Sequence, residues 1–213
     1  MTKVIERYTL LIIGMLALFG VSVQFIISIN RAIAEDNSVS QVVINMLGYF
    51  TILTNTFAAV VLTILGLLPN SKIGKVFATP EVFGCVVSSM LWVGIGFHLL
   101  LSDYWSPDGM EAVSNYLNHY IVPSALLLIW LVFPPKTKIP KWTPFIWEIY
   151  PVIYGIYVIL RGKLIDKYPY PFFDVNVIGY SKALLNGLVI LLVILGIGYF
   201  VRATVNLSSR LQR

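Results

Sequence analysis

The sequence predicts an all-α fold, a polytopic membrane helical bundle of about six transmembrane helices with both termini in the cytoplasm. Three observations lead to this prediction: an apolar composition, six long apolar stretches, and an uneven division of basic residues between the loops. The 213 residues are 58% hydrophobic and 12% charged, with a mean hydropathy of +0.83, whereas a soluble domain carries roughly 25% charged residues. We therefore expect one six-helix transmembrane domain over residues 1–213.

Six stretches are long and apolar enough to cross a hydrocarbon core, which takes about 20 residues as a helix. The fifth stretch is the weakest because it contains Glu148. The first is about 22 residues long, which exceeds the roughly 7–15 apolar residues of a signal peptide, so we expect it to be retained. The six stretches are Tyr8–Ile29, Val42–Leu68, Val82–Leu101, Val113–Phe133, Pro144–Leu160 and Ser181–Val201.

The basic residues divide unequally between the two sides that six spans define. Ten lie on the side of the two termini and five on the opposite side, where most acidic residues also lie. Basic loops stay in the cytoplasm, so both termini are predicted to be cytoplasmic in a cell-membrane protein. The ten are Lys3, Arg7, Lys72, Lys75, Lys136, Lys138, Lys141, Arg202, Arg210 and Arg213; the five are Arg31, Arg161, Lys163, Lys167 and Lys182.

Composition also excludes several classes of function. The net charge of +5 comes from basic residues beside apolar runs, so it indicates membrane orientation, with lipids and not nucleic acid as partners. Cys85 is the single cysteine, and His98 and His119 are the two histidines. These residues are too few for an internal disulfide or a metal cluster, so no metal or cofactor is expected.

The second span carries a polar face. At about 100° per residue, Gly48, Thr51, Thr54, Asn55 and Ala58 fall on one side of a helix. Small and hydroxyl residues of this kind also form packing seams between membrane helices. Asn55 fits a seam less well, because a buried amide needs several hydrogen-bond partners.

The fourth span carries an ionisable side chain. Asn115, His119 and Pro123 are spaced at i, i+4 and i+8 and share a face. Pro123 has no N–H, so the carbonyl of His119 loses its helical partner. A histidine that is only hydrogen-bonded inside the bundle explains the same residues, but intramembrane ionisable groups commonly mark functional sites. Thr51 and His119 lie at similar depths, about 13 and 9 Å from the same surface, so the two could meet.

Two further features lie near the same surface. His98 ends the third span, where it either joins the polar pocket or anchors the helix at the interface. The segment Tyr168–Asp174 contains two prolines and several aromatic residues. Because exposed aromatic side chains are costly, we expect this segment to fold over the mouth of the bundle. Asp174 would then approach Lys182 or the histidine.

Four motifs occur in an order that resembles the predicted six-transmembrane protein family, which is similar to the androgen-induced-gene family of intramembrane hydrolases. The resemblance covers nearly the whole chain. The motifs are Tyr49-Phe50-Thr51-Ile52-Leu53-Thr54-Asn55, Asn118-His119-Tyr120-Ile121-Val122-Pro123, Tyr150-Pro151-x-x-Tyr154 and Tyr168-Pro169-Tyr170-Pro171-Phe172-Phe173-Asp174.

The resemblance implies a threonine nucleophile and a histidine base that cleave esters joining a fatty acid to a hydroxy fatty acid. Carried over by motif, these roles fall on Thr51 and His119. The motif spacing differs by one residue from the eukaryotic pattern, so Thr54 is an alternative nucleophile. The residue chemistry fits, because a threonine hydroxyl needs an adjacent base. Asn115, Asn118 or a backbone carbonyl would hold the histidine tautomer, and Asn55 would donate to an oxyanion.

Two other functions fit the sequence. In the first, the protein would bind haem with His98 and His119, on adjacent spans, as axial ligands. Six-span cytochromes of this kind usually need four histidines, and this sequence has two. A transporter or another non-enzymatic multi-pass protein is the second alternative. It predicts a polar path through the bundle, yet the inner halves of the spans hold few polar groups, and the absence of an internal repeat also argues against it. The oligomeric state and the acyl chains of any substrate do not follow from the sequence.

Overall fold

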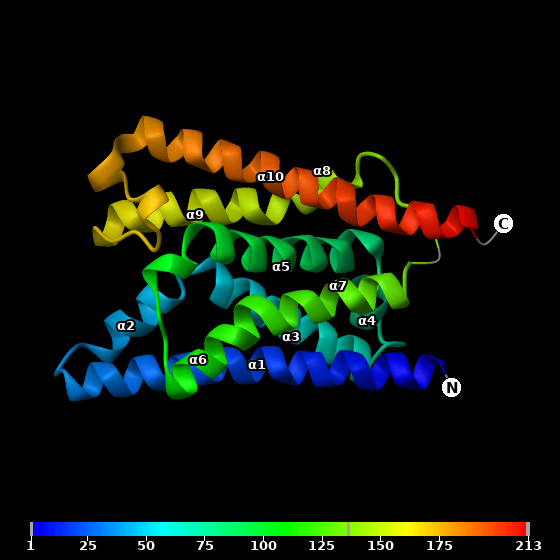
Figure 1. Ribbon diagram of the computed structural model, residues 1–213, viewed down its shortest axis with the longest axis horizontal. Coiled ribbons are helices and arrows are strands. Elements are labelled where there is room, and N and C mark those ends of the chain that lie inside the picture. Colours follow the sequence, from blue (N-terminus) through cyan, green and yellow to red (C-terminus); the bar gives the residue numbers. More distant parts are fainter. Residues whose placement is uncertain (1, 136, 212–213) are drawn as a thin grey trace.

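A computed structural model describes residues 2–135 and 137–211, and within these residues every regular element is a helix. Six helices are long and apolar enough to cross a membrane, which confirms the predicted all-α bundle. The two termini lie at one end of the bundle, here called the terminal end, and the short helices α2 and η3 lie at the other, here called the η3 end (Figure 1).

The residues that the structure describes form ten α-helices and three short helical segments, and α2, α4, η1 and η3 lie in the connections between the six spans. Three spans are interrupted or preceded by a short segment, so their boundaries differ from the predicted ones. The elements are α1 Thr2–Ala34, α2 Val39–Met46, α3 Phe50–Leu67, α4 Lys72–Phe77, α5 Pro80–Leu100, η1 Ser102–Tyr104, α6 Gly109–Tyr116, η2 Leu117–Ile121, α7 Val122–Val132, α8 Thr143–Trp147, α9 Ile149–Ile165, η3 Pro171–Phe173 and α10 Val175–Leu211.

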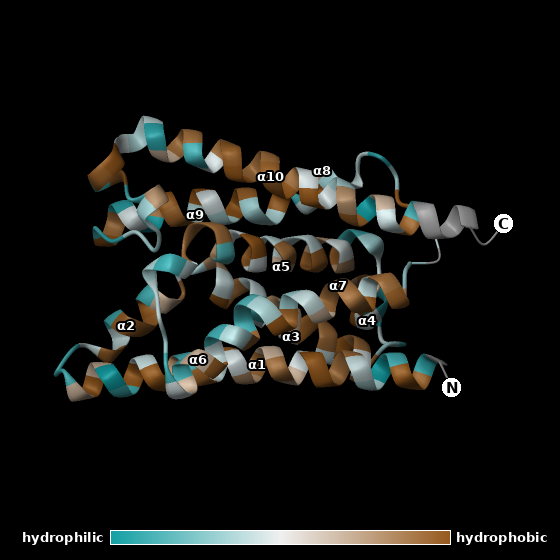
Figure 2. Cartoon of the chain, in the orientation of Figure 1, coloured by the Kyte–Doolittle hydropathy of each residue, from teal (hydrophilic) through white to brown (hydrophobic). Residues whose placement is uncertain are grey.

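Helix α5 is the central helix and contacts α3, α7, α8 and α10. Its N-terminus is well capped. The hydroxyl of Thr79 accepts from the backbone N–H of Val82, and Pro80 occupies the first helical position, where proline is favoured. Helices α1, α9 and α10 carry many large apolar side chains that are exposed, and Figure 2 shows the predominance of hydrophobic residues along these helices. Such apolar faces are expected where lipid replaces water.

The predicted span Val42–Leu68 is wrong as a single helix, because the chain breaks between α2 and α3. Arg161, Tyr157 and Tyr154, which form a stripe on α9, donate hydrogen bonds to the carbonyl groups of Ile44, Leu47 and Gly48 at 2.7, 3.1 and 2.8 Å. These donors satisfy the carbonyls that a helix end leaves free. Gly48 therefore lies before α3 and not on the polar face that we predicted for it.

The fourth span contains a π-helical segment, η2, between α6 and α7. Its signature is the hydrogen bond from the N–H of Val122 to the carbonyl of Leu117, five residues earlier. The segment ends at Ile121, and Pro123 follows at the start of α7, where it has no N–H to offer to the carbonyl of His119. Gly94 of α5 approaches this carbonyl so closely that a Cβ there would lie 2.8 Å from the oxygen. Single π-turns of this kind are frequent at functional sites.

The segment Tyr168–Asp174 folds back onto the bundle, as predicted. Tyr170 and Phe173 are 8% and 7% exposed, respectively. The hydroxyl of Tyr170 accepts a hydrogen bond from the backbone N–H of Phe50 at 3.0 Å. The segment therefore covers the N-terminal end of α3, where Thr51 lies.

Candidate functional site

Thr51 and His119 are in direct contact. Thr51 lies in the first turn of α3 and His119 in η2, and Oγ1 of Thr51 is 3.3 Å from Nε2 of His119. The chain thus joins the nucleophile and base that the sequence proposed, although 68 residues separate them. The distance is slightly longer than the roughly 2.6–3.2 Å of an engaged pair, which is common in unliganded sites.

The tautomer of His119 follows from its second contact. Nδ1 lies 2.7 Å from Oδ1 of Asn115 and 3.1 Å from the carbonyl oxygen of Asn115. A carbonyl oxygen only accepts, so Nδ1 carries the proton and donates it. Nε2 then bears the lone pair and accepts from the hydroxyl of Thr51. This arrangement is the one that a general base requires.

Aromatic rings fix the orientation of His119. The ring of Phe97 stacks on the imidazole with centroids 3.8 Å apart and an interplanar angle of 16°. Trp105 meets the imidazole edge-on at 6.5 Å. His119 itself is 8% exposed. A buried ring that is stacked on one face and hydrogen-bonded at both nitrogens has little freedom to rotate.

Thr54, the alternative nucleophile, points elsewhere. Its side chain is fully buried, and Oγ1 lies 3.0 Å from the hydroxyl of Tyr150 on α9. It contacts no ionisable base and does not line the cavity beside Thr51. Of the two threonines, Thr51 is therefore the one that contacts the histidine and lines the cavity.

Asn55 and Asn118 connect the two halves of the site. Nδ2 of Asn55 donates to the carbonyl of Thr51 at 3.0 Å and to the carbonyl of Asn118 at 3.2 Å. Nδ2 of Asn118 donates to Oγ of Ser114 at 3.1 Å. Ser114 in turn donates to the carbonyl of Gly20 on α1 at 2.8 Å. Both hydrogens of the Asn55 amide are engaged, so in this structure Asn55 holds α3 against η2 and is not directed at an oxyanion.

Tyr170 is a neighbour of Thr51 that sequence reasoning did not select. Burial raises the pKa of Tyr170 to about 12, and hydrogen bonding with the Thr51 hydroxyl and with the backbone N–H groups of Phe50 and Thr51 opposes the rise. The hydroxyl therefore stays protonated at neutral pH. The aromatic segment Tyr168–Asp174 was predicted to cover this end of the bundle, but nothing in its sequence indicates which tyrosine reaches α3.

His98 and Asp174 do not join the pair. His98 is exposed at the end of α5, where Nδ1 lies 3.4 Å from the hydroxyl of Tyr120. Asp174 caps the start of α10, and its Oδ1 accepts from the backbone N–H of Asn176 at 3.1 Å. The interfacial role is therefore the better description of His98, and Asp174 reaches neither Thr51 nor His119 by these contacts.

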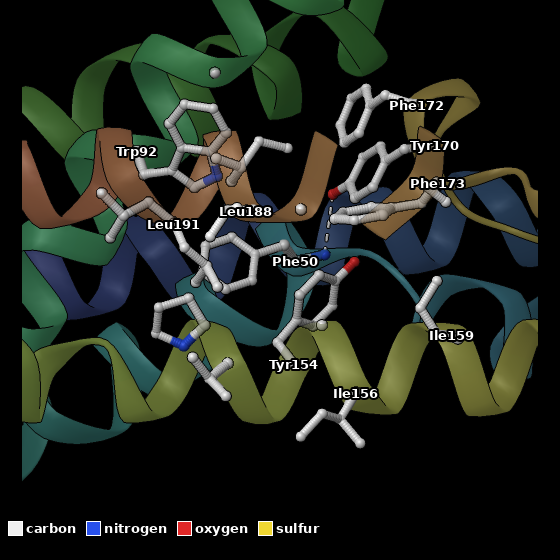
Figure 3. Close-up of a pocket in the computed structure, with 18 of the residues that line it drawn as sticks. Phe50, Trp92, Tyr154, Ile156, Ile159, Tyr170, Phe172, Phe173, Leu188 and Leu191 are labelled. Atoms are coloured by element: carbon white, nitrogen blue, oxygen red, sulfur yellow. Dashed lines mark hydrogen bonds between the residues drawn. The ribbon is translucent and has the colours of Figure 1, made fainter. Parts of the chain in front are cut away.

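Thr51 opens onto a cavity of about 420 Å³ between α3, α5, α9, α10 and η3. Figure 3 shows Tyr170, Phe172 and Phe173 at one end of this cavity and Trp92 with Leu191 toward the other. Its lining is apolar apart from the hydroxyl groups of Thr51, Tyr154 and Tyr170 and the indole N–H of Trp92. A pocket of this size with few polar groups is typical of a small-molecule site.

Within residues 2–135 and 137–211, no three His, Cys, Asp or Glu side chains lie close enough together to hold a metal ion. A bis-histidine haem site also fits poorly. Both ring nitrogens of His119 already take part in hydrogen bonds, and His98 points to Tyr120. Axial ligation through Nε2 would require the imidazole of His119 to leave Thr51, and His98 would have to leave Tyr120.

The fold and the site together define a multi-pass α-helical membrane protein with a paired threonine and histidine beside an apolar cavity. Comparison with known proteins does not narrow this class, since no protein-family model, curated protein or solved structure matches the chain.

Proposed function

We propose that this protein is an intramembrane lipid-ester hydrolase that uses Thr51 as its nucleophile and His119 as its general base. The observation that carries the proposal is the contact between Thr51 and His119, with Thr51 also lining an apolar cavity. The Nδ1 proton of His119 is held by Asn115, so Nε2 is ready to accept the Thr51 proton. This is the nucleophile, base and orienting group that recur in acyl-transfer enzymes.

The reaction has two stages. Oγ1 of Thr51 attacks the ester carbonyl carbon while Nε2 of His119 takes the hydroxyl proton. The carbon–oxygen bond to the leaving alcohol then breaks, and His119 returns the proton to that oxygen, which leaves an acyl-threonine. In the second stage, His119 removes a proton from water, and the resulting hydroxide attacks the acyl carbon. The bond from this carbon to Oγ1 then breaks, the fatty acid leaves, and His119 returns the proton to Oγ1 of Thr51.

Negative charge that forms on the carbonyl oxygen needs a hydrogen-bond donor. The hydroxyl of Tyr170 accepts from the backbone N–H of Phe50 at the start of α3, so its own proton is the donor that we assign to this oxygen. Donors of this kind stabilise a tetrahedral intermediate, and losing one costs on the order of 10²–10³ in kcat. The expected substrate is a fatty acid ester of a hydroxy fatty acid, and the expected location is the cell membrane with cytoplasmic termini.

The test is an assay of ester hydrolysis by the purified protein in detergent, in which the free fatty acid that is released is measured. Thr51→Val and His119→Gln should each remove most of the activity, and the double variant should lose little more, because residues that act as one unit are strongly non-additive. Thr56→Val is the matched control, since Thr56 is exposed on the same helix and bonds only the carbonyl of Ile52. Full activity in Thr51→Val would refute the proposal.

A further inference from the structure

The cavity beside Thr51 is long and runs parallel to the helices. Along α10 its lining extends from Ala183 to Ile194, and along α5 from Leu101 to Trp92. Eleven residues of helix α10 span about 16 Å at 1.5 Å per residue. This length is about half of the roughly 30 Å hydrocarbon core, which is the length that one leaflet provides for an acyl chain.

Thr51 and the segment Tyr168–Asp174 lie at the η3 end of this cavity, and the lining continues from there toward the middle of the bundle. Because α3 begins at Phe50, Thr51 lies near the surface end of its span. Trp92 lies about nine residues from the η3 end of α5, and Ile194 lies about fifteen residues beyond the break of α10 at Gly179, so both lie deeper. An ester carbonyl at Thr51 would therefore place its acyl chain in the deep part of the cavity.

The cavity is also bordered by lipid-facing side chains. Ile156 and Leu160 of α9 are 57% and 58% exposed, and Leu184 and Leu188 of α10 are 62% and 54% exposed, yet all four belong to the lining. Their exposed faces meet hydrocarbon in a membrane. A chain can thus enter sideways between α9 and α10 without crossing water.

We propose that the cavity between α9 and α10 binds the single acyl chain of an ester whose acyl side is uncharged, with the carbonyl at Thr51, and that Gly155 sets the length of chain it accepts. The proposal rests on the proposed function for the placement of the carbonyl, but the binding of the chain is independent of catalysis. No Asp, Glu, Lys, Arg or His lies among the described residues of the lining. A phosphate headgroup would find no counter-charge there, whereas methylene groups match the apolar walls.

Gly155 occupies the middle of the lining on α9, one turn from both Pro151 and Ile159. A Cβ atom at this position would meet no atom within 4 Å. A larger side chain would therefore fill the cavity and not displace a neighbour, and helix α9 would tolerate it because glycine is a poor helix former. Gly196 of α10 offers a matched control, since a Cβ there also meets nothing within 4 Å and the residue is not part of the lining.

Photolabelling tests the binding of the chain without hydrolysis. The probe is the methyl ester of hexadecanoic acid with a diazirine near the end of the chain, applied in detergent to the Thr51→Val protein. We expect labels on Trp92, Leu191 or Ile194. Gly155→Leu should lower this labelling at least fivefold, and Gly196→Leu should leave it unchanged. Labels confined to other helix faces, equal labelling of Gly155→Leu, or equal competition by a diacyl phospholipid would overturn the proposal.

Chain-length preference tests the same residue in the otherwise unaltered protein. Gly155→Leu should raise the ratio of kcat/KM for an eight-carbon acyl ester over a sixteen-carbon one at least tenfold, and Gly196→Leu should not change it. If the labelling pattern holds but no ester is hydrolysed, the proposed function fails and the acyl-chain site stands. If hydrolysis depends on Thr51 while Gly155→Leu changes neither labelling nor the ratio, the acyl-chain site fails and the proposed function stands.

Discussion

Oδ1 of Asn115 lies 2.7 Å from Nδ1 of His119, one turn away on the same span, and this contact leaves Nε2 free to accept from Thr51. The backbone carbonyl of Asn115 is a second acceptor at 3.1 Å. Asn115→Ala should therefore lower kcat by about tenfold, well short of the roughly 10²–10⁴-fold that a general base contributes. KM should hold, because Asn115 does not line the cavity. Steady-state kinetics check this, and a loss as large as that of His119→Gln would contradict it.

Thr51 and Thr54 make different hydrogen bonds, so valine at Thr54 should mainly lower stability and valine at Thr51 should mainly lower activity. Thr54→Val leaves the hydroxyl of Tyr150 without its partner and should lower the free energy of unfolding by about 0.5–2 kcal/mol, with activity largely kept. Thr51→Val should keep the melting temperature and lose activity, and Thr51→Ser should recover part of it. Thermal denaturation in detergent beside the ester assay separates the two outcomes. Normal activity in Thr51→Val with none in Thr54→Val would reverse the assignment.

Arg161 is 8% exposed and joins α9 to the end of α2 through the carbonyl of Ile44 and Oδ1 of Asn45. Arg161→Met should lower the free energy of unfolding by about 1–3 kcal/mol, because two part-buried acceptors lose a charged donor. Arg161→Lys should not restore it, since an ammonium cannot reproduce the fork of the guanidinium. Lys163→Met, at an exposed position on the same helix, is the control. Equal melting temperatures for Arg161→Met and Lys163→Met would refute this role.

Tyr170 should make the stability of the folded protein depend on pH in the alkaline range. Burial raises the pKa of Tyr170 from its usual value to about 12 in the folded protein. The stabilisation by its protonated hydroxyl is complete below about pH 10 and is lost as the pH rises toward 12. Tyr170→Phe should melt below the parent at pH 8, and this gap should narrow by pH 11.5. A gap that stays constant over this range would show that Tyr170 is not buried as described.

The orientation of the bundle is tested by chemical labelling of introduced cysteines. Asp108→Cys and Lys167→Cys lie at exposed positions of the η3 end, whereas Asn70→Cys and Lys138→Cys lie at exposed positions of the terminal end. The ten-to-five division of basic residues predicts that an impermeant thiol reagent labels the first pair in intact cells and spares the second. The buried Cys85 should give little background. The reverse pattern would place the termini outside.

The number of spans could be predicted because hydrocarbon thickness imposes a length on every apolar run. The break between α2 and α3 could not, because its donors are Tyr154, Tyr157 and Arg161, more than a hundred residues away in the chain. A continuous apolar run from Val42 to Leu68 contains no proline that would mark it. Tertiary hydrogen bonds, and not local sequence, decide where this helix begins.

For the candidate site, too, some features could be predicted from the sequence and others could not. Depth along the spans was enough to predict that Thr51 and His119 could meet, and helical spacing placed Asn115 on the face of His119. The choice between Thr51 and Thr54 was out of reach, because both fell on one predicted face and the partner of Thr54 is Tyr150 on another span. Phe97 and Tyr170 were also missed, since an aromatic residue in a membrane protein carries no mark that distinguishes a site from a packing contact.

Covalent trapping of Thr51 tests the central proposal most directly. A fluorophosphonate probe should modify the purified protein, and mass spectrometry of its peptides should find the adduct on Thr51 in the parent and in Thr54→Val. His119→Gln should react far more slowly, because the hydroxyl then lacks its base, and Thr51→Val should carry no adduct. An adduct on another residue, or equal labelling of Thr51→Val and the parent, would contradict the proposal that Thr51 is the nucleophile.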